Sequence, residues 1–117
     1  MEFNEHKPIY LQIADTICDK ILSEEWKPEE RIPSVRELGV LLGVNPNTIM
    51  RTYDYLQSSD IIFNKRGVGY FISKDAKTTI ISVQKHKFIQ EELPKILKRM
   101  KLLGINPSEL LKIDKDN

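Results

Sequence analysis

A short polar segment, residues 45–51, carries side chains of the types that read the edges of nucleic-acid bases. Asparagine can form a bidentate pair of hydrogen bonds with adenine, and arginine can form one with guanine. The candidate readers are Asn45, Asn47, Thr48 and Arg51, with Met50 beside them. Because Asn45 precedes a proline, helix capping is its main expected role and a phosphate contact its second. A solvated helix end is the alternative for Asn47 and Thr48.

Two further groups of residues are suited to phosphate contacts. Ser34 and Arg36 stand at the expected start of another helix, and helix N-termini bind anions. Arg36 could instead form a surface salt bridge with Glu37 or Asp54, which would contribute little stability. The second group is Lys65, Arg66, Gly67 and Gly69, where two glycines would let the backbone approach a phosphate or the minor groove. A plain hairpin turn would need the glycines but not both cations.

Start and stop signals place the first two groups on helices. Apolar residues recur every three to four positions over 8–22, which predicts an amphipathic helix that frays near Glu25. Ser34 and Glu37 form a capping box, which predicts a second helix over 35–42 that ends at Gly43. Asparagine before proline predicts a third helix over 46–58. Two helices joined by a tight, glycine-containing turn make a helix-turn-helix.

The segment after the third helix changes pattern. Residues 61–63 and 69–72 are β-branched and aromatic, and the turn-like residues between them predict a β-hairpin. We expect the aromatic residues to lie in the core rather than to stack on bases. They are Tyr53, Tyr55, Phe63, Tyr70 and Phe71. The order of helix, helix-turn-helix and hairpin predicts a mostly α winged helix over 1–74, whose last helix enters the major groove.

The remaining residues, 75–117, are expected to form a second domain, a helical tail. Pro94 is expected to kink or divide its long helix, Gly104 to end it, and a capped helix over 107–113 to follow. One apolar stripe comprises Ile89, Leu93, Ile96, Leu97, Met100 and Leu103. Its main spacing of four and three residues is typical of packed helices and predicts a dimerisation surface. The alternative is that the stripe only covers the chain's own core.

Length and charge narrow the class of protein. With 117 residues, 40% hydrophobic and 30% charged, the chain has room for one domain and an appendage but not for a large enzyme scaffold. The net charge is only +1, yet residues 31–74 hold six bases against three acids. Residues 1–30 hold eight acids against three bases. Such an uneven distribution of charge is also common on solvated surfaces. The near-neutral net charge and the acidic first 30 residues leave open a second class of protein, a winged helix that binds a protein partner instead of DNA.

Catalytic and metal chemistry is not expected. Cys18 is the one cysteine and suits a core position, while His6 and His86 are far apart in sequence. Since no catalytic set or phosphate loop accompanies them, we expect no enzyme, metal or cofactor. The absence of a visible signal peptide or membrane-spanning stretch predicts a cytoplasmic protein. The short tail leaves little room for a small-molecule effector.

The motifs over residues 8–73 closely resemble the GntR family of bacterial transcription regulators. They are Pro8-Ile9-Tyr10-Leu11-Gln12-Ile13, Arg31-Ile32-Pro33-Ser34-Val35-Arg36-Glu37-Leu38, Leu42-Gly43-Val44-Asn45-Pro46-Asn47-Thr48-Ile49 and Gly67-Val68-Gly69-Tyr70-Phe71-Ile72. The tail, with Glu92-Leu93-Pro94 and Leu102-Leu103-Gly104, resembles that of the YtrA-like subgroup. That subgroup lacks the large effector-binding domain of other members.

The resemblance implies a repressor that binds a palindromic operator as a homodimer, and control of ABC transporter genes. The positions that it implies in DNA contact are Ser34, Arg36, Asn47, Thr48 and Gly69. The chain departs from the family pattern at Pro46, where many members have arginine, so base readout there must be different or absent. It also has Glu29 and Asp60 where glycine is common, which affects two connecting turns.

Overall fold

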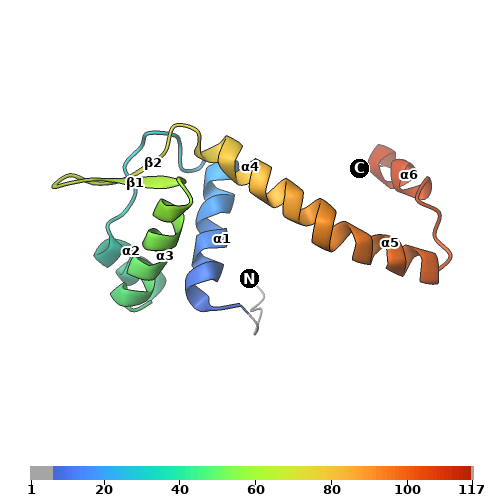
Figure 1. Ribbon diagram of the computed structural model, residues 1–117, viewed down its shortest axis with the longest axis horizontal. Coiled ribbons are helices and arrows are strands. Elements are labelled where there is room, and N and C mark those ends of the chain that lie inside the picture. The colour runs from blue at the N-terminus through green and yellow to red at the C-terminus, as the bar shows by residue number, and fades with distance from the viewer. Residues whose placement is uncertain (1–6, 117) are drawn as a thin grey trace. The chain divides into compact units, whose positions relative to one another are not determined.

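The computed structural model describes residues 7–116, which belong to two compact units, one ending at Ile81 and one starting at Ser82. We call them the N-terminal unit and the C-terminal unit. Figure 1 labels their helices and strands. The elements are α1 (Ile9–Leu22), α2 (Val35–Leu42), α3 (Pro46–Ser58), β1 (Ile62–Lys65), β2 (Gly69–Ile72), α4 (Ala76–Lys87), the π-helical segment η1 (Phe88–Glu92), α5 (Leu93–Leu102) and α6 (Glu109–Asp116). Within the described range, no helix is long and apolar enough to cross a membrane.

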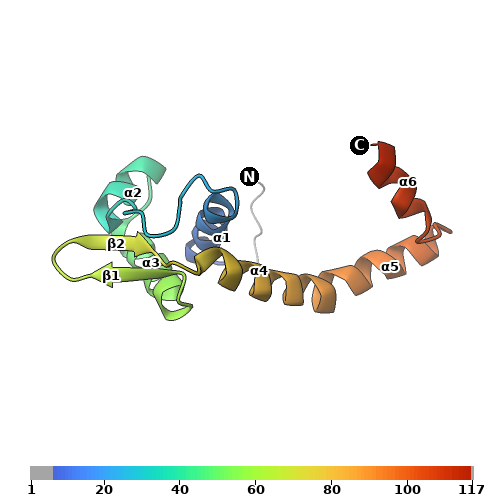
Figure 2. The ribbon, with the colours of Figure 1, turned by 90° about the horizontal axis from the view of Figure 1, so that it is seen from above.

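In the N-terminal unit, α1 and α2 pack against α3, and the antiparallel hairpin follows the end of α3 (Figures 1 and 2). The core is built from the apolar stripes that the sequence predicts on the helices, closed on the hairpin side by Ile62 and Ile72. Ile17, Ile49 and Leu56 are almost completely buried in it. Burying one such side chain contributes roughly 1.5–3 kcal/mol. This shared core therefore holds α3 in place.

The helix-turn-helix has the bounds that its capping signals predict. The capping box starts α2 at Val35, and Gly43 ends it in the left-handed conformation, at φ +65°. The side-chain oxygen of Asn45 then caps α3, which begins at Pro46. The prediction is less accurate for α1, which ends at Leu22 and so stops before the expected fraying point.

The hairpin is longer than predicted on its first side. Asn64 and Lys65, expected in the turn, belong to β1, and Lys65 pairs with Gly69. The turn therefore comprises residues 66–68, and it is closed by the Val68 N–H, which donates to the Lys65 carbonyl at 2.8 Å. Extending the strand carries the turn farther from the core.

Two of the five aromatic residues expected in the core lie on the surface, which corrects that prediction. The side chains of Tyr55 and Phe63 are 44% and 37% exposed. Tyr53 is fully buried and meets the ring of Tyr70 edge-on at 4.9 Å. Phe63 instead stacks on Phe71 at 5.6 Å. Neighbouring residues of a strand face opposite sides, so burial of the preceding isoleucine turns Phe63 outward.

The first turns of α4 belong to the N-terminal unit. Ala76 and Ile80 are buried in the same core as the three preceding helices. Lys77 also lies 3.3 Å from the carboxylate of Glu24, at the end of α1. The winged-helix core therefore extends past residue 74, where the sequence suggested a division into two domains.

In the C-terminal unit, Pro94 is preceded by a stretch of π-helix rather than by a simple kink. The N–H of Leu93 donates to the carbonyl of Phe88, five residues earlier. In a regular α-helix the ring of Pro94 would clash with the carbonyl of Gln90, and the proline has no N–H to donate to it. The wider turn of η1 accommodates both effects.

The end of the tail agrees with its predicted signals apart from one boundary. Gly104 follows α5 in the left-handed conformation, at φ +71°. The last helix, α6, begins at Glu109 instead of Pro107. Asn106 accounts for the difference, because its side-chain oxygen accepts the Ser108 N–H at 3.0 Å and turns the chain before the helix starts.

Candidate nucleic-acid interface

At the start of α3, one polar side chain is hydrogen-bonded as the helix cap and another has no hydrogen-bonding partner. The oxygen of Asn45 accepts the N–H of Asn47 at 2.8 Å, so its capping role is confirmed. The side chain of Asn47 is exposed and has no hydrogen-bonding partner among residues 7–116. Thr48, the next residue, is half-buried. Asn47 is therefore the residue of this turn best placed to contact a base.

Arg51 lies one turn further along α3, on the side that faces α1. Its guanidinium carbon is 4.2 Å from the centre of the Tyr10 ring. A shallow groove of about 400 Å³ surrounds this pair. It is lined by Pro8, Ile9, Tyr10, Asn47, Thr48 and Arg51. Arg51 thus shares one groove with the predicted base-reading residues.

At the start of α2, the side chains of the capping box are likewise engaged in hydrogen bonds. The Ser34 hydroxyl accepts the Glu37 N–H at 3.1 Å, and the Glu37 carboxylate accepts the Ser34 N–H at 3.1 Å. The Ser34 N–H, followed by the Ser34 hydroxyl, favours the ionised carboxylate of Glu37 and lowers its pKa, with a smaller effect from the charge of Arg31. The hydroxyl proton that interacts with the Glu37 carboxylate is also the one that Ser34 can donate to a phosphate.

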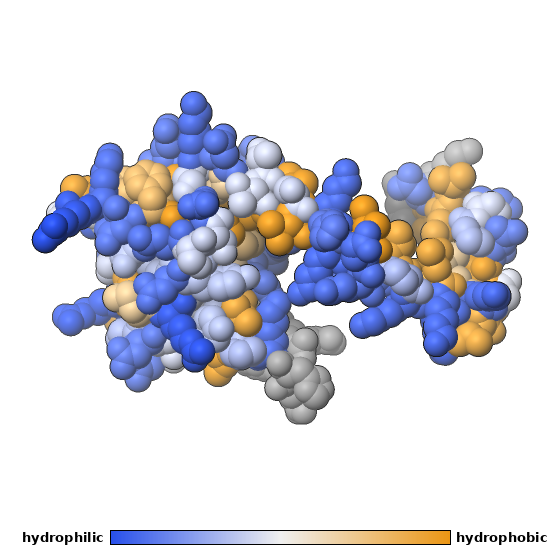
Figure 3. All heavy atoms as spheres, viewed as in Figure 1, coloured by the Kyte–Doolittle hydropathy of each residue, from blue (hydrophilic) through white to orange (hydrophobic). Residues whose placement is uncertain are grey.

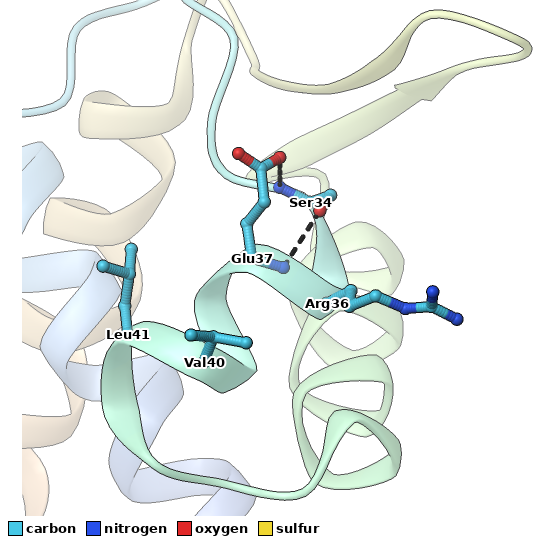
Figure 4. A pocket seen from close by; sticks show the side chains of 5 residues that line it. All are labelled: Ser34, Arg36, Glu37, Val40 and Leu41. Atoms are coloured by element: carbon cyan, nitrogen blue, oxygen red, sulfur yellow. Dashed lines mark hydrogen bonds between the residues drawn. The ribbon is translucent and has the colours of Figure 1, made fainter.

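Arg36 takes no part in the capping box. In Figure 4 its side chain leaves α2 on the side opposite Leu41, at the edge of a shallow pocket of about 410 Å³. In the described part of the chain it forms an ion pair with neither Glu37 nor Asp54, the partners considered as an alternative. Its guanidinium is therefore available for a contact outside the chain.

Two buried hydroxyl groups hold α3 to its neighbours. The Tyr53 hydroxyl donates to the Pro33 carbonyl at 2.6 Å, directly before the cap of α2. The Thr52 hydroxyl lies 2.9 Å from the Tyr10 carbonyl and 3.1 Å from the Thr48 carbonyl, so its single proton serves one or the other. Burial raises the pKa of Tyr53 well above its ordinary value, which keeps the phenol protonated as a donor.

The hairpin presents the predicted cations at its tip. Lys65 places its ammonium 5.0 Å from the centre of the Phe71 ring. Arg66 is exposed and has no ion pair within the described residues. Gly67 adopts φ +79° in the turn, with open space around it. The tip can therefore approach a phosphate group closely.

Gly69 has a structural role that the sequence did not indicate. A Cβ atom added there would lie 2.8 Å from Nε of Arg31, and the backbone is at φ +145°. Arg31 forms an isolated β-bridge with Phe71, and its side chain reaches Gly69, the residue of β2 next to the turn. Sequence reasoning left Arg31 out of the site. The sequence does show a basic residue three positions before Ser34. Its contact with Gly69 could not be predicted from local spacing, because the two residues are far apart in the chain.

The stripe expected to form a dimer lies on the C-terminal unit with unequal exposure. Met100 is buried and Leu93 is half-buried, whereas the others are exposed by 43–57%. The exposed members are Ile89, Ile96, Leu97 and Leu103. Ile89 lies in η1, so the regular helical spacing begins only at Leu93. Figure 3 shows such apolar residues, in orange, among charged ones on this unit.

Other chemistry finds little support in the described residues. No group of three or more histidine, cysteine, aspartate or glutamate residues between 7 and 116 could hold a metal ion. Cys18 is buried in the core as expected, and burial, with the nearby charges of Asp15 and Asp19, raises its pKa to about 11. Its thiol is therefore unreactive near neutral pH. His6 lies outside the described residues.

Comparisons with known proteins agree with this geometry. Residues 9–72 match the model of the family described as bacterial regulatory proteins, gntR family. YhcF, an HTH-type transcriptional regulator of Bacillus subtilis, is 42% identical over 110 residues, which cover 94% of this chain and 89% of YhcF. The HTH-type transcriptional repressor YtrA of the same organism is 36% identical over 103 residues, which cover 88% of this chain and 78% of YtrA.

The fold is also shared with solved structures. The structure of a GntR-family regulator from Bacteroides thetaiotaomicron is 46% identical and superposes with a TM-score of 0.76. The match covers 94% of this chain and all of that one, so it includes the helices that follow the hairpin. The chain therefore belongs to the gntR family of bacterial regulatory proteins, as a DNA-binding transcription regulator of winged helix-turn-helix type and not as an enzyme.

Proposed function

We propose that this protein is a cytoplasmic repressor that binds a palindromic operator as a homodimer. The first turns of α2 and α3 and the hairpin contact the DNA. One observation carries the proposal: Arg36, Asn47 and Arg66 expose polar side chains without partners among residues 7–116, whereas Asn45 and Glu37 beside them are occupied by capping.

The three exposed side chains have different tasks in this proposal. Asn47 meets a base edge in the major groove, because the first turn of the second helix of a helix-turn-helix is the part that enters it. Arg36 contacts DNA next to it, with the Ser34 hydroxyl donating to a phosphate. Arg66 contacts the backbone or the minor groove from the hairpin tip. Pro46 offers only an apolar ring, so specificity depends more heavily on Asn47 and Arg36.

Dimerisation assigns a partner to the exposed apolar residues of the tail. Ile96, Leu97 and Leu103 are 43%, 43% and 57% exposed on α5 and just after it. Packing each of them against a second copy contributes roughly 1.5–3 kcal/mol. A dimer also presents two recognition helices, which explains a two-fold symmetric operator with half-sites about one helical turn apart.

The relatives support a proposal for the regulated genes. YtrA carries the name of a repressor, and the resemblance to the YtrA-like subgroup favours repression of ABC transporter genes. Footprinting of the protein on genomic DNA, followed by inspection of the neighbouring genes, tests this part of the proposal.

The DNA-binding part is tested by gel shift with the promoter of the protein's own gene and with a scrambled duplex of the same composition. At about 150 mM salt, where non-specific binding is weak, we expect the promoter to bind at least about a thousandfold more tightly. Equal and weak binding of both duplexes would refute sequence-specific regulation and favour a winged helix that binds a protein.

The dimer is tested by sedimentation of charged variants. Ile96→Asp and Leu97→Asp place a carboxylate on the exposed stripe, and we expect both to shift the protein to a monomer. Lys95→Asp adds the same carboxylate to a neighbouring exposed residue outside the stripe and should leave the dimer intact. If the two stripe variants still sediment as dimers, the interface lies elsewhere.

A further inference from the structure

Tyr10 is attached to the recognition helix at three points. Its ring lies under the guanidinium of Arg51, with 4.2 Å between the guanidinium carbon and the ring centre. The same ring meets Tyr55 edge-on at 6.4 Å. Its carbonyl oxygen is 2.9 Å from the hydroxyl of the buried Thr52. Residues 51, 52 and 55 are all on α3, so the first turn of α1 is held against one side of that helix.

Arg51 is the charged group among these contacts. It is exposed, and apart from the Tyr10 ring it has no charged or aromatic partner in the described part of the chain. The groove that it borders also contains Asn47 and Thr48 from the first turn of α3, and Pro8 and Ile9 from the start of α1. A negatively charged group in this groove would meet a guanidinium whose direction is already set.

We propose that Tyr10 is a positioning residue for Arg51, and that the pair holds a DNA backbone phosphate in this groove, beside the bases that Asn47 contacts. The inference rests on the proposed function, because it needs α3 in the major groove. It goes beyond that function by assigning Arg51 to the backbone instead of to guanine and by giving Tyr10 a part in binding.

The physical reason is the conformational flexibility of an unrestrained arginine side chain. A long exposed arginine loses rotamer freedom when it binds a phosphate, and this loss weakens the contact. The face of an aromatic ring attracts a guanidinium and restricts its position before binding. The planar group can then donate two parallel hydrogen bonds to phosphate oxygens. Tyr10 thus lowers the entropic cost of a contact that it does not itself make.

The test is a double-mutant cycle in the full-length protein, measured by fluorescence anisotropy on the promoter duplex. Arg51→Gln should weaken binding about tenfold or more and lower the slope of log K against log salt by about one. Tyr10→Leu should weaken binding roughly two- to fivefold, whereas Tyr10→Phe, which keeps the ring, should bind like the wild type. In the Arg51→Gln protein, Tyr10→Leu should have no further effect.

Two outcomes would overturn the inference. If Tyr10→Leu weakens binding by the same factor in the wild-type protein and in the Arg51→Gln protein, the role of Tyr10 is only structural. If Tyr10→Phe binds as poorly as Tyr10→Leu, the hydroxyl is needed and the ring contact is not. Tyr55→Leu is the matched control, since it removes the other ring contact of Tyr10 and leaves Arg51 on its partner; it should bind like the wild type.

A second measurement separates a phosphate contact from a base contact. Promoter duplexes that each carry one uncharged methylphosphonate are compared across the protected region. At one flanking position the substitution should weaken the wild type about as much as Arg51→Gln does, and it should add nothing to that variant. A loss that follows a change of base pair, and no such flanking position, would place Arg51 on a base. Failure of the wild type to prefer the promoter would instead refute the proposed function.

Discussion

The hydroxyl of Tyr53 donates a 2.6 Å hydrogen bond to the carbonyl of Pro33. Tyr53 is on the recognition helix, and Pro33 directly precedes the cap of α2, so this buried bond joins the two helix starts that carry the predicted DNA contacts. Helix packing alone would allow small sliding of α2 on α3. The bond sets where Ser34 and Arg36 lie relative to Asn47.

Tyr53→Phe should lower the free energy of unfolding by about 1–2 kcal/mol. The substitution keeps the ring in the core but leaves the Pro33 carbonyl without its donor, which costs a desolvated acceptor. Urea unfolding followed by circular dichroism measures the change. Tyr55→Phe is the control, because the Tyr55 ring is 44% exposed, and its stability should stay within about 0.5 kcal/mol of the wild type. Equal losses in both variants would contradict the role given to the bond.

Asn47→Ala and Arg66→Ala should affect DNA binding in different ways. Loss of Asn47 should cost about 1–3 kcal/mol and relax the preference at one base pair. Loss of Arg66 should weaken binding to all sequences and lower the salt slope by about one. Binding titrations at several salt concentrations, on the promoter and on single base-pair variants, distinguish the two. The reverse behaviour would show that the groove assignment is wrong.

Gly69→Ala should disturb the hairpin more than Gly67→Ala. Both glycines have positive φ, but φ +145° at position 69 is farther from the left-handed region that other residues can enter than φ +79° at position 67. An added Cβ at position 69 would also displace the movable end of the Arg31 side chain, whereas at position 67 it has open space. Thermal unfolding should therefore show a larger loss of stability for Gly69→Ala. Adding Arg31→Ala should recover part of that loss, since only the backbone strain then remains. No recovery would mean that Arg31 is not the cause.

Glu29→Gly should raise the free energy of unfolding, by up to about 1 kcal/mol. Glu29 has φ +65°, a conformation that costs roughly 1–2 kcal/mol for a residue with a Cβ and little for glycine. Part of the gain is offset by the greater freedom of glycine in the unfolded chain. Glu30 is not among the residues with positive φ, so Glu30→Gly should lower stability. Calorimetry on the two variants gives the sign of each effect.

The stability should fall as the pH rises from about 8.5 to 11, partly because of Cys18. The thiol of the unfolded chain ionises near its ordinary pKa of about 8.5, whereas in the folded protein the pKa is about 11. Above the lower value the unfolded state releases more protons and is favoured. Cys18→Ala removes the contribution of the thiol to this pH dependence. The difference in the free energy of unfolding between the wild type and the variant should therefore narrow between about pH 8 and pH 10. A constant gap would contradict the raised pKa.

The parts of the fold that follow from local signals were predictable from the sequence. A capping box, a glycine and an asparagine before a proline determine where α2 and α3 begin and end, and these bounds agree with the structure. The same local signals identify Asn47 and Arg36 as candidate contacts, because neither residue has a role in a cap. These assignments depend on residues within one or two helical turns.

What the sequence did not reveal depends on contacts between distant residues. Arg31 meets Gly69, and Tyr10 meets Arg51, across separations that no periodicity reports. The outward direction of Phe63 depends on which side of its strand the core lies. Likewise, a proline in a helical pattern indicates a disturbance but does not say that a wider turn will absorb it.

That wider turn has a consequence for how the length of the tail can vary. A π-helical segment is equivalent to one residue inserted into an α-helix, so η1 already holds a residue that a continuous helix would not need. Deleting one residue between Phe88 and Glu92, together with Pro94→Ala, should leave an unbroken helix with the apolar residues after it in the same phase. A one-residue deletion within α3 would instead turn every following core residue by about 100°. Residues 88–92 are therefore the part of this chain where the loss of a single residue can be tolerated.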